Sequence, residues 1–288
     1  MATNQSLAVF RSRRGWTVLS VHFSIAFAAL AGVVQLILTV RPVSLLQGAD
    51  TLLGIAALSC CWALARSLPR EAVEHGFKNP DFSVVVKVGD LFDEPSDLVI
   101  GFTDVFDTDT EDDSIIAPRT VQGQLLARVF DGDVPALDAA LMSSLSGARV
   151  CEAESRESKP KGKLDRYPVG TVAVVPHGGS RFYCVAYSHM SNDLIAQSSV
   201  DSIWQSLGNL WSAIGAHGHL EPVAVPILGS DLAKVGSLGR ESLLKMIILS
   251  FVAASRASLV SRQLTVVVHP DDADEVNLLE VRAFLTSL

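Results

Sequence analysis

Glycine, acidic and hydroxyl residues gather at the ends of three apolar runs in this sequence, where they could bind an anionic ligand. In VKVGDLFDEPSDLVIGFTD, the pair Gly89-Asp90 ends one apolar run and residues 101–104 end the next. A second segment is VGTVAVVPHGG, and the third is VAVPILGSDLAKVGSLGRE, in which an apolar run leads through Gly229, Ser230 and Gly236 toward a helical pattern. Glycine-rich turns of this kind can present backbone N–H groups to a phosphate. Tight packing is the alternative role for each glycine taken singly.

Carboxylates also lie close together in the sequence, at Asp104, Asp107 and Asp109, and these could in principle activate a water molecule. No histidine or metal-ligand spacing accompanies them, and the glycine and terminal glutamate of a calcium-binding loop are absent. His217 and His219 flank a glycine, where either a metal or an exposed helix end would explain them. We therefore predict no catalytic residue, no metal and no cofactor, and we favour binding over catalysis.

The elements that would position these residues alternate between β-branched runs and helical patterns, which predicts a mixed-sheet α/β domain. The expected strands cover residues 82–88, 97–102, 170–175, 182–187, 222–227 and 263–268. Apolar residues at three- and four-residue steps predict helices over 122–130, 135–146, 199–216, 240–257 and 271–285. Strand ends in open α/β sheets are where ligands bind, which favours the two turns of the first segment as part of a ligand site. Lys159, Lys161 and Lys163 fall in an expected loop, and a solvated loop is the favoured reading over an anion site.

Composition limits the classes of partner. Of the 288 residues, 49% are hydrophobic and the formal net charge is −8. The basic residues form no long run, which argues against nucleic acid as a partner. The four cysteines suggest neither a disulfide framework nor a zinc site, and we expect reduced, mostly buried thiols.

The apolar excess is concentrated near the N-terminus, where two segments predict a transmembrane hairpin. Residues 17–40 carry no formal charge and are long enough to cross a bilayer, whereas the second segment, centred on 51–65, has uncertain ends. A cleaved signal peptide is the alternative for the first, but the run is too long and no small-residue cleavage site follows it. The lipid bilayer is therefore an expected partner, and small residues such as Gly32 would permit self-association.

Arginines flank the hairpin unevenly, which predicts its orientation. They precede the first span and follow the second, at positions 11, 13, 14, 66 and 70, whereas the connector holds only Arg41. The positive-inside rule then puts both termini of a multi-pass protein in the cytoplasm. We expect a cytoplasmic tail over 1–16, the hairpin over 17–66, a linker over 67–81 and a ligand-binding domain over 82–288.

The order and spacing of the three segments resemble the macro domain, a fold that binds ADP-ribose. Gly89-Asp90-Leu91 stands in the place of its early Gly-Asp-Ile element, and residues 226–236 stand in the place of its second phosphate-binding loop. The resemblance covers about residue 82 to the C-terminus. GDLFDEPSDLVIGFTDVFDT and IIAPRTVQGQLL, the latter over 115–126, are closer still to the macro-like domain of Thoeris anti-phage effectors. Two spans before that domain are similar to the membrane effector of the second type of Thoeris system.

This resemblance implies a function and a set of ligand-binding residues. It implies a sensor for an ADP-ribose derivative that a partner TIR-domain enzyme makes from NAD, followed by homo-oligomeric assembly that damages the cell inner membrane. The signal in that family is similar to histidine joined to ADP-ribose. Asp90 would hydrogen-bond the adenine amino group, although a turn-capping carboxylate is the alternative for Asp90, and Leu91 beside it is also an implied ligand-binding residue. The other implied residues are Gly101, Phe102, Thr103, Asp104, Asp107 and Thr108 around the ribose and phosphate, and Gly229, Ser230, Asp231 and Gly236 around the diphosphate.

The chain departs from hydrolytic macro domains after the second expected strand. Those domains carry an Asn-Ala-Ala-Asn stretch and a run of glycines, whereas this chain has GFTDVFDTDTEDD. The alternative function is therefore a membrane-tethered hydrolase of an ADP-ribose ester or a related nucleotide. An acidic turn beside a diphosphate also predicts a cationic group on the ligand that would offset Asp104 and Asp107, and a solvated acidic loop is the alternative.

Overall fold

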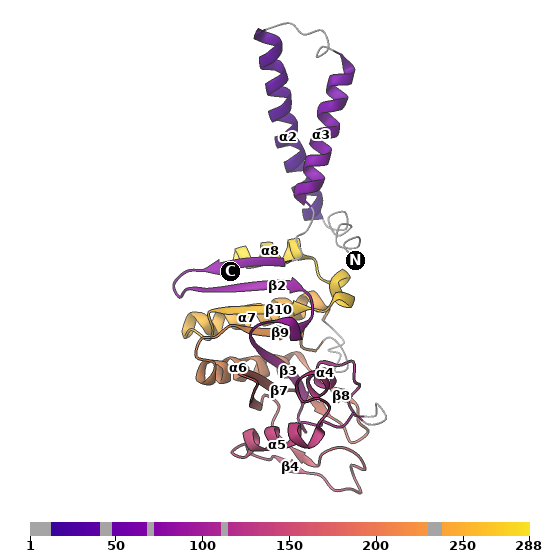
Figure 1. The fold of residues 1–288 in the computed structure, drawn as a ribbon, viewed down its shortest axis with the longest axis vertical. Helices are drawn as coiled ribbons and strands as arrows, with labels where there is room; N and C mark the ends of the chain where they lie inside the picture. Colours follow the sequence, from indigo (N-terminus) through magenta and orange to yellow (C-terminus); the bar gives the residue numbers. More distant parts are fainter. Residues whose placement is uncertain (1–12, 41–47, 68–71, 111–114, 230–237) are drawn as a thin grey trace.

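The computed structural model describes residues 13–40, 48–67, 72–110, 115–229 and 238–288. It consists of an N-terminal helical hairpin and a mixed α/β domain (Figure 1). The hairpin contains α2 (Arg13–Val40) and α3 (Ala49–Ser67), which pack against each other and extend away from the edge of the domain. The predicted fold class is confirmed.

The domain is built on an eight-stranded sheet with the order β1-β2-β10-β9-β3-β7-β6, and β8 pairs with β7. Its strands are β1 (Ala72–Phe77), β2 (Phe82–Val88), β3 (Asp97–Thr103), β6 (Val172–His177), β7 (Ser180–Met190), β8 (Ala196–Gln197), β9 (Val223–Pro226) and β10 (Gln263–Val268). The five central strands run parallel, and β1, β6 and β8 pair antiparallel with their neighbours. A separate two-stranded ribbon pairs β4 (Glu152–Ala153) with β5 (Asp165–Arg166).

Helices cover both faces of the sheet, so its central strands are buried on both sides and read as continuous apolar runs. One core lies under α6 (Val200–His217), α7 (Arg240–Ala257) and α8 (Leu278–Ser287), and the other lies under α4 (Val121–Val129) and α5 (Val134–Leu145). Two short 3-10 helices, η2 (Leu91–Asp93) and η4 (Pro270–Glu275), follow β2 and β10. The carboxyl ends of the parallel strands therefore meet at one edge, and Gly89-Asp90 follows β2 and Gly229 follows β9 at this edge.

Three sequence predictions need correction. The expected linker over 67–81 is wrong for Ala72–Phe77, which forms the edge strand β1 and pairs with β2 from Ala72↔Lys87 to Phe77↔Phe82. The single helix expected over 271–285 is split, because Asn277 caps a new helix by accepting from the Leu279 N–H. All four cysteines are free as expected, but only Cys184 is buried, so the expectation of mostly buried thiols is wrong.

Candidate functional site

The turn after β2 places Asp90 at the carboxyl edge of the sheet. Gly89 N donates to the Val268 carbonyl at 3.0 Å, which ties the end of β2 to the end of β10. Asp90 then caps η2, since its Oδ1 accepts from Phe92 N at 2.9 Å. The capping role proposed as the alternative for Asp90 is therefore confirmed. The side chain remains 41% exposed, so the cap leaves room for a ligand.

Arg128, on α4, contacts the same carboxylate and was missed by the sequence reasoning. Its Nη1 lies 2.5 Å from Asp90 Oδ2, and its Nη2 lies 3.3 Å from Asp93 Oδ1. The guanidinium carbon lies 4.9 Å from the centre of the Phe92 ring. Partial burial raises the pKa of Asp90, but hydrogen bonds from Arg128 and Phe92 N outweigh burial and hold that pKa below its usual value of 3.8. Asp90 is therefore an anion at neutral pH.

A pocket of about 280 Å³ opens beside this turn. Its lining includes Gly89, Asp90 and Asp93, together with Ala72 from the start of β1. Lys87 and Glu94 form its wall as an ion pair with 2.5 Å between Nζ and Oε1. A pocket at a sheet's carboxyl edge that contains a fixed carboxylate can accept a donor such as an exocyclic amino group.

Gly101, Phe102 and Thr103 lie within β3 itself, and the first two of them pack the core. A Cβ at position 101 would lie 2.6 Å from the Tyr187 ring and 3.0 Å from Leu228, so only glycine fits there. Phe102 is buried and stacks on Phe106 with 5.6 Å between ring centres. Leu91 is likewise buried in this core. The close approach at Gly101 brings β3 against the residue that precedes Gly229.

Asp104 is neutralised inside the chain. Its Oδ2 lies 2.8 Å from Arg166 Nη1 and 2.7 Å from His189 Nδ1, and its Oδ1 accepts from Met190 N at 2.9 Å. Asp104 is buried, so the solvated acidic loop given as the alternative is wrong at this residue. His189, near the end of β7, is therefore a partner of this carboxylate.

Asp107 and Thr108 are also engaged by other parts of the chain. Asp107 Oδ1 accepts from Lys163 N at 2.6 Å, and its Oδ2 lies 3.8 Å from Lys159 Nζ. Burial raises the pKa of Asp107, which the Lys163 N–H and the two lysines offset only in part. The hydroxyl of Thr108 is likewise engaged within the chain, because Thr108 Oγ1 donates a hydrogen bond to Asp138 Oδ1 at 2.5 Å. Lys159 is fully buried, so the solvated basic loop predicted over these lysines is wrong at Lys159, whereas Lys161 is exposed as predicted.

The second glycine-rich turn begins at Gly229, whose φ of +82° favours glycine. Ser230, Asp231 and Gly236 lie outside the described residues, as do acidic positions 111–113 of the first turn. Beyond this gap, α7 starts at Arg240, which is held by Asp272 at 2.9 Å and by Glu275 at 2.6 Å. Within the described ranges, no group of three or more His, Cys, Asp or Glu side chains is arranged to hold a metal ion.

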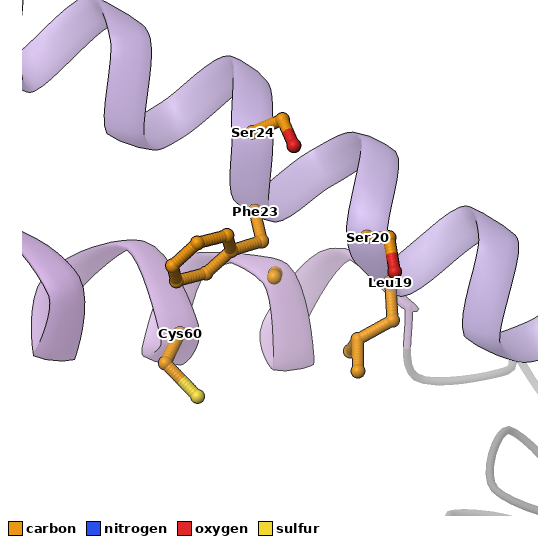
Figure 2. A pocket seen from close by; sticks show the side chains of 6 residues that line it. Leu19, Ser20, Phe23, Ser24 and Cys60 are labelled. Carbon is orange, nitrogen blue, oxygen red and sulfur yellow. The ribbon is translucent and has the colours of Figure 1, made fainter.

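The hairpin contributes a second pocket, of about 340 Å³, between its two helices. Figure 2 shows Leu19 and Phe23 reaching from α2 toward α3, with Cys60 on the facing helix. Trp16–Val40 and Ala49–Arg66 are long and apolar enough to cross a membrane, and their large side chains are mostly uncovered. Leu36 and Leu53 are 67% and 68% exposed, for example.

Comparisons with known proteins agree with this geometry. The family model of the Thoeris protein ThsA macro domain matches residues 84–269. A relative named Thoeris protein ThsA, from Bacillus amyloliquefaciens (strain Y2), is 26% identical over 206 residues, which is 70% of this chain and 67% of the relative.

Solved structures show the same fold at low identity. The Oceanobacillus iheyensis macrodomain with ADP has a TM-score of 0.51 at 11% identity and covers 76% of this chain and 100% of its own. A mutant of that macrodomain with ADPR has a TM-score of 0.50 at 10% identity, with 74% and 100% covered. The match of the family model over most of the domain, together with this fold, shows that the chain belongs to the Thoeris ThsA macro domain family.

Proposed function

We propose that this protein is a membrane-anchored anti-phage defence effector whose domain binds an ADP-ribose-derived nucleotide. Membership of the Thoeris ThsA macro domain family supports this proposal, and macrodomain structures of the same fold carry ADP and ADPR. Asp90 supports the same ligand class, because it is an ionised, partly exposed acceptor at the sheet edge beside a pocket. On this proposal, Asp90 accepts the adenine amino group, and the turn beginning at Gly229 approaches the diphosphate.

The observation that carries the proposal is that one chain joins a ThsA-family domain to an uncovered apolar hairpin. Large apolar side chains that face outward on both helices would be unfavourable in water, where contiguous exposed patches of this kind mark a partner or a membrane. The bilayer is the partner that fits, since the span over Trp16–Val40 is 25 residues long and a crossing helix needs about 20. We place the hairpin in the cell inner membrane with both termini in the cytoplasm.

The signal and its consequence complete the proposal. A TIR-domain enzyme would supply the ligand, for which histidine joined to ADP-ribose is the candidate, and ligand binding would drive homo-oligomerisation that disrupts the membrane. Arg166 and Lys159 already pair with Asp104 and Asp107 inside the chain, so the proposal does not rely on these two carboxylates for selectivity toward a cationic ligand. The same ion pairs occupy the carboxylates that a hydrolase would have used to activate water.

The test is leakage from liposomes that contain the full-length protein and an enclosed dye. We expect release on addition of histidine-linked ADP-ribose and little release without a nucleotide. Asp90→Ala should weaken ligand binding, measured by calorimetry, by about tenfold, because it removes a hydrogen bond between charged and polar groups. Asp193→Ala is the control, since it removes an exposed carboxylate that does not line the pocket beside Asp90.

Chromatography of the nucleotide after incubation separates the hydrolase alternative from the effector. Unchanged ligand together with dye release supports the effector, whereas a new nucleotide product without release supports the hydrolase. If none of the ADP-ribose compounds binds, the ligand class proposed here is wrong.

A further inference from the structure

Arg128 joins the candidate ligand-binding turn to α4 through three contacts. Nη1 contacts Asp90 Oδ2 at 2.5 Å, Nη2 contacts Asp93 Oδ1 at 3.3 Å, and the guanidinium lies over Phe92. Gln124 Oε1 accepts from the same Nη1 at 3.3 Å. Asp90 and Arg128 are 38 positions apart in the sequence, so the tertiary fold brings them together.

The geometry points to Arg128 as a positioning residue for base recognition: it fixes the Asp90 carboxylate so that the carboxylate selects a base with an amino group. This inference rests on the proposed function and adds to it a determinant of ligand specificity. The ligand class is an adenine nucleotide of the ADP-ribose type, and the base that it excludes is hypoxanthine, which has an oxygen in place of the amino group.

The hydrogen-bonding capacity of Asp90 supports this assignment. A carboxylate has about four acceptor positions. Oδ1 uses one for the Phe92 N–H and Oδ2 uses one for Arg128, so acceptor positions remain on both oxygens. Both oxygens are also fixed in direction, one by η2 and the other by α4. The amino group of adenine could therefore donate to a carboxylate that is already oriented. The carbonyl oxygen of hypoxanthine would be repelled by the negative charge of the same carboxylate.

Other charged groups near Asp90 do not replace Arg128. Asp93 and Glu94 are like charges on the same turn, and Lys87 is paired with Glu94 at 2.5 Å. His269, at the end of β10, acts on Asp90 only through its charge, whereas Arg128 both hydrogen-bonds Asp90 and attracts it. Loss of Arg128 therefore removes the cation that orients the carboxylate.

The experiment compares the affinity of the full-length protein in nanodiscs for ADP-ribose and for inosine diphosphate ribose. The variants are Arg128→Met, which keeps the apolar stem over Phe92, and Arg128→Lys, which keeps the charge. Arg181→Met is the matched control. Arg181 also pairs with an aspartate, Asp97 at 3.5 Å, but Asp97 lies at the start of β3, at the edge of the sheet opposite to the carboxyl edge where Asp90 lies. Circular dichroism of each variant checks that it is folded.

We expect the wild type and Arg181→Met to prefer ADP-ribose by about tenfold or more, as for one hydrogen bond to a charged group. Arg128→Met should reduce this preference to less than about threefold, and Arg128→Lys should recover part of it. A folded Arg128→Met that keeps the full preference, or that binds ADP-ribose more tightly, would overturn the inference. A wild type that binds both nucleotides equally would overturn it as well, whereas a wild type that binds neither contradicts the proposed function.

Discussion

Arg166 is the centre of a buried ionic cluster beside the candidate site. Its Nη1 contacts Asp104 Oδ2 at 2.8 Å and donates to the Met190 carbonyl at 2.9 Å. Its Nη2 contacts Glu154 Oε1 at 3.0 Å. The Arg166 side chain of β5 therefore joins the ends of β3 and β7 to the β4–β5 ribbon. Buried charges in such a cluster lack water, so each charge is stabilised by its oppositely charged partners.

Asp104→Ala tests this dependence. We expect the free energy of unfolding to fall by up to about 3–5 kcal/mol, because the substitution removes the buried carboxylate partner of Arg166 and leaves only Glu154 and Glu152 to offset its charge. Urea denaturation of the detergent-solubilised full-length chain, followed by tryptophan fluorescence, measures it. The double variant Asp104→Ala/Arg166→Met should be more stable than the single variant, and equal stability of the two would show that the pair is not coupled.

Asp107 predicts a pH dependence with a definite sign. Burial raises the pKa of this carboxyl above its usual 3.8, and Oδ2 has no hydrogen-bond partner. The native state therefore binds the proton more tightly than the unfolded state, and the Asp107 contribution to stability decreases as the pH rises from about 3.8 through the native pKa. The stability of Asp107→Asn relative to the wild type should increase over this interval and then level off. Denaturation curves of both proteins between about pH 3.5 and pH 8 measure this difference in stability. A difference that does not change with pH would contradict the raised pKa of Asp107.

At the scale of elements, the hairpin has a packed face and an uncovered face. On α3 the packed face consists of three buried residues spaced four positions apart, Ile55, Ser59 and Ala63. Ser59 Oγ donates to the Ile55 carbonyl at 2.7 Å, so its hydroxyl is satisfied within the helix. Gly32, by contrast, has no atom within 4 Å of where a Cβ would lie, so it does not mediate the contact within this hairpin. Its role in self-association stays a prediction.

Ile25→Lys tests whether the uncovered face meets lipid. The side chain is 60% exposed on α2, and a lysine near the middle of a membrane span costs about 2.5–3.5 kcal/mol. We expect a smaller fraction of the protein to remain with membranes after carbonate extraction. Met142→Lys, at a 68% exposed position on α5, is the control and should leave that fraction unchanged. If Ile25→Lys and Met142→Lys leave the same fraction of protein with the membranes after carbonate extraction, this face of α2 is not in lipid.

The elements differ in how far their sequences predict them. The central parallel strands were predicted because burial on both faces requires continuous apolar runs, as in Asp97–Thr103. The edge strand β1, with the sequence AVEHGF, was missed because its polar residues are tolerated at an edge. Asp90 was identified from its local turn, but the roles of Asp104 and Arg128 were not, because their partners lie 62 and 38 positions away. Local sequence carries no signal for ion pairs of that kind.

At the scale of the whole molecule, the arginine distribution predicts which side of the membrane the domain faces. A tag fused after Leu288 should be inaccessible to an impermeant reagent in intact cells and become accessible after permeabilisation. A tag in the connector over 41–48 is the control and should be labelled in intact cells. Labelling of the C-terminal tag without permeabilisation would reverse the proposed orientation.

The pairing of β1 with β2 also determines how the domain would respond to mechanical load. β1 is the first element after α3, and its first residue, Ala72, pairs with Lys87 of β2. Lys87 lies two residues before Gly89. The hairpin stands away from this edge of the sheet, roughly across the strand direction (Figure 1). A pull from the hairpin would therefore act at Ala72 and peel β1 away pair by pair, a path that requires less force than shearing all of its hydrogen bonds together. The first bonds to open would lie beside the wall of the Asp90 pocket, so tension from the bilayer would reach the turn before it reached the core.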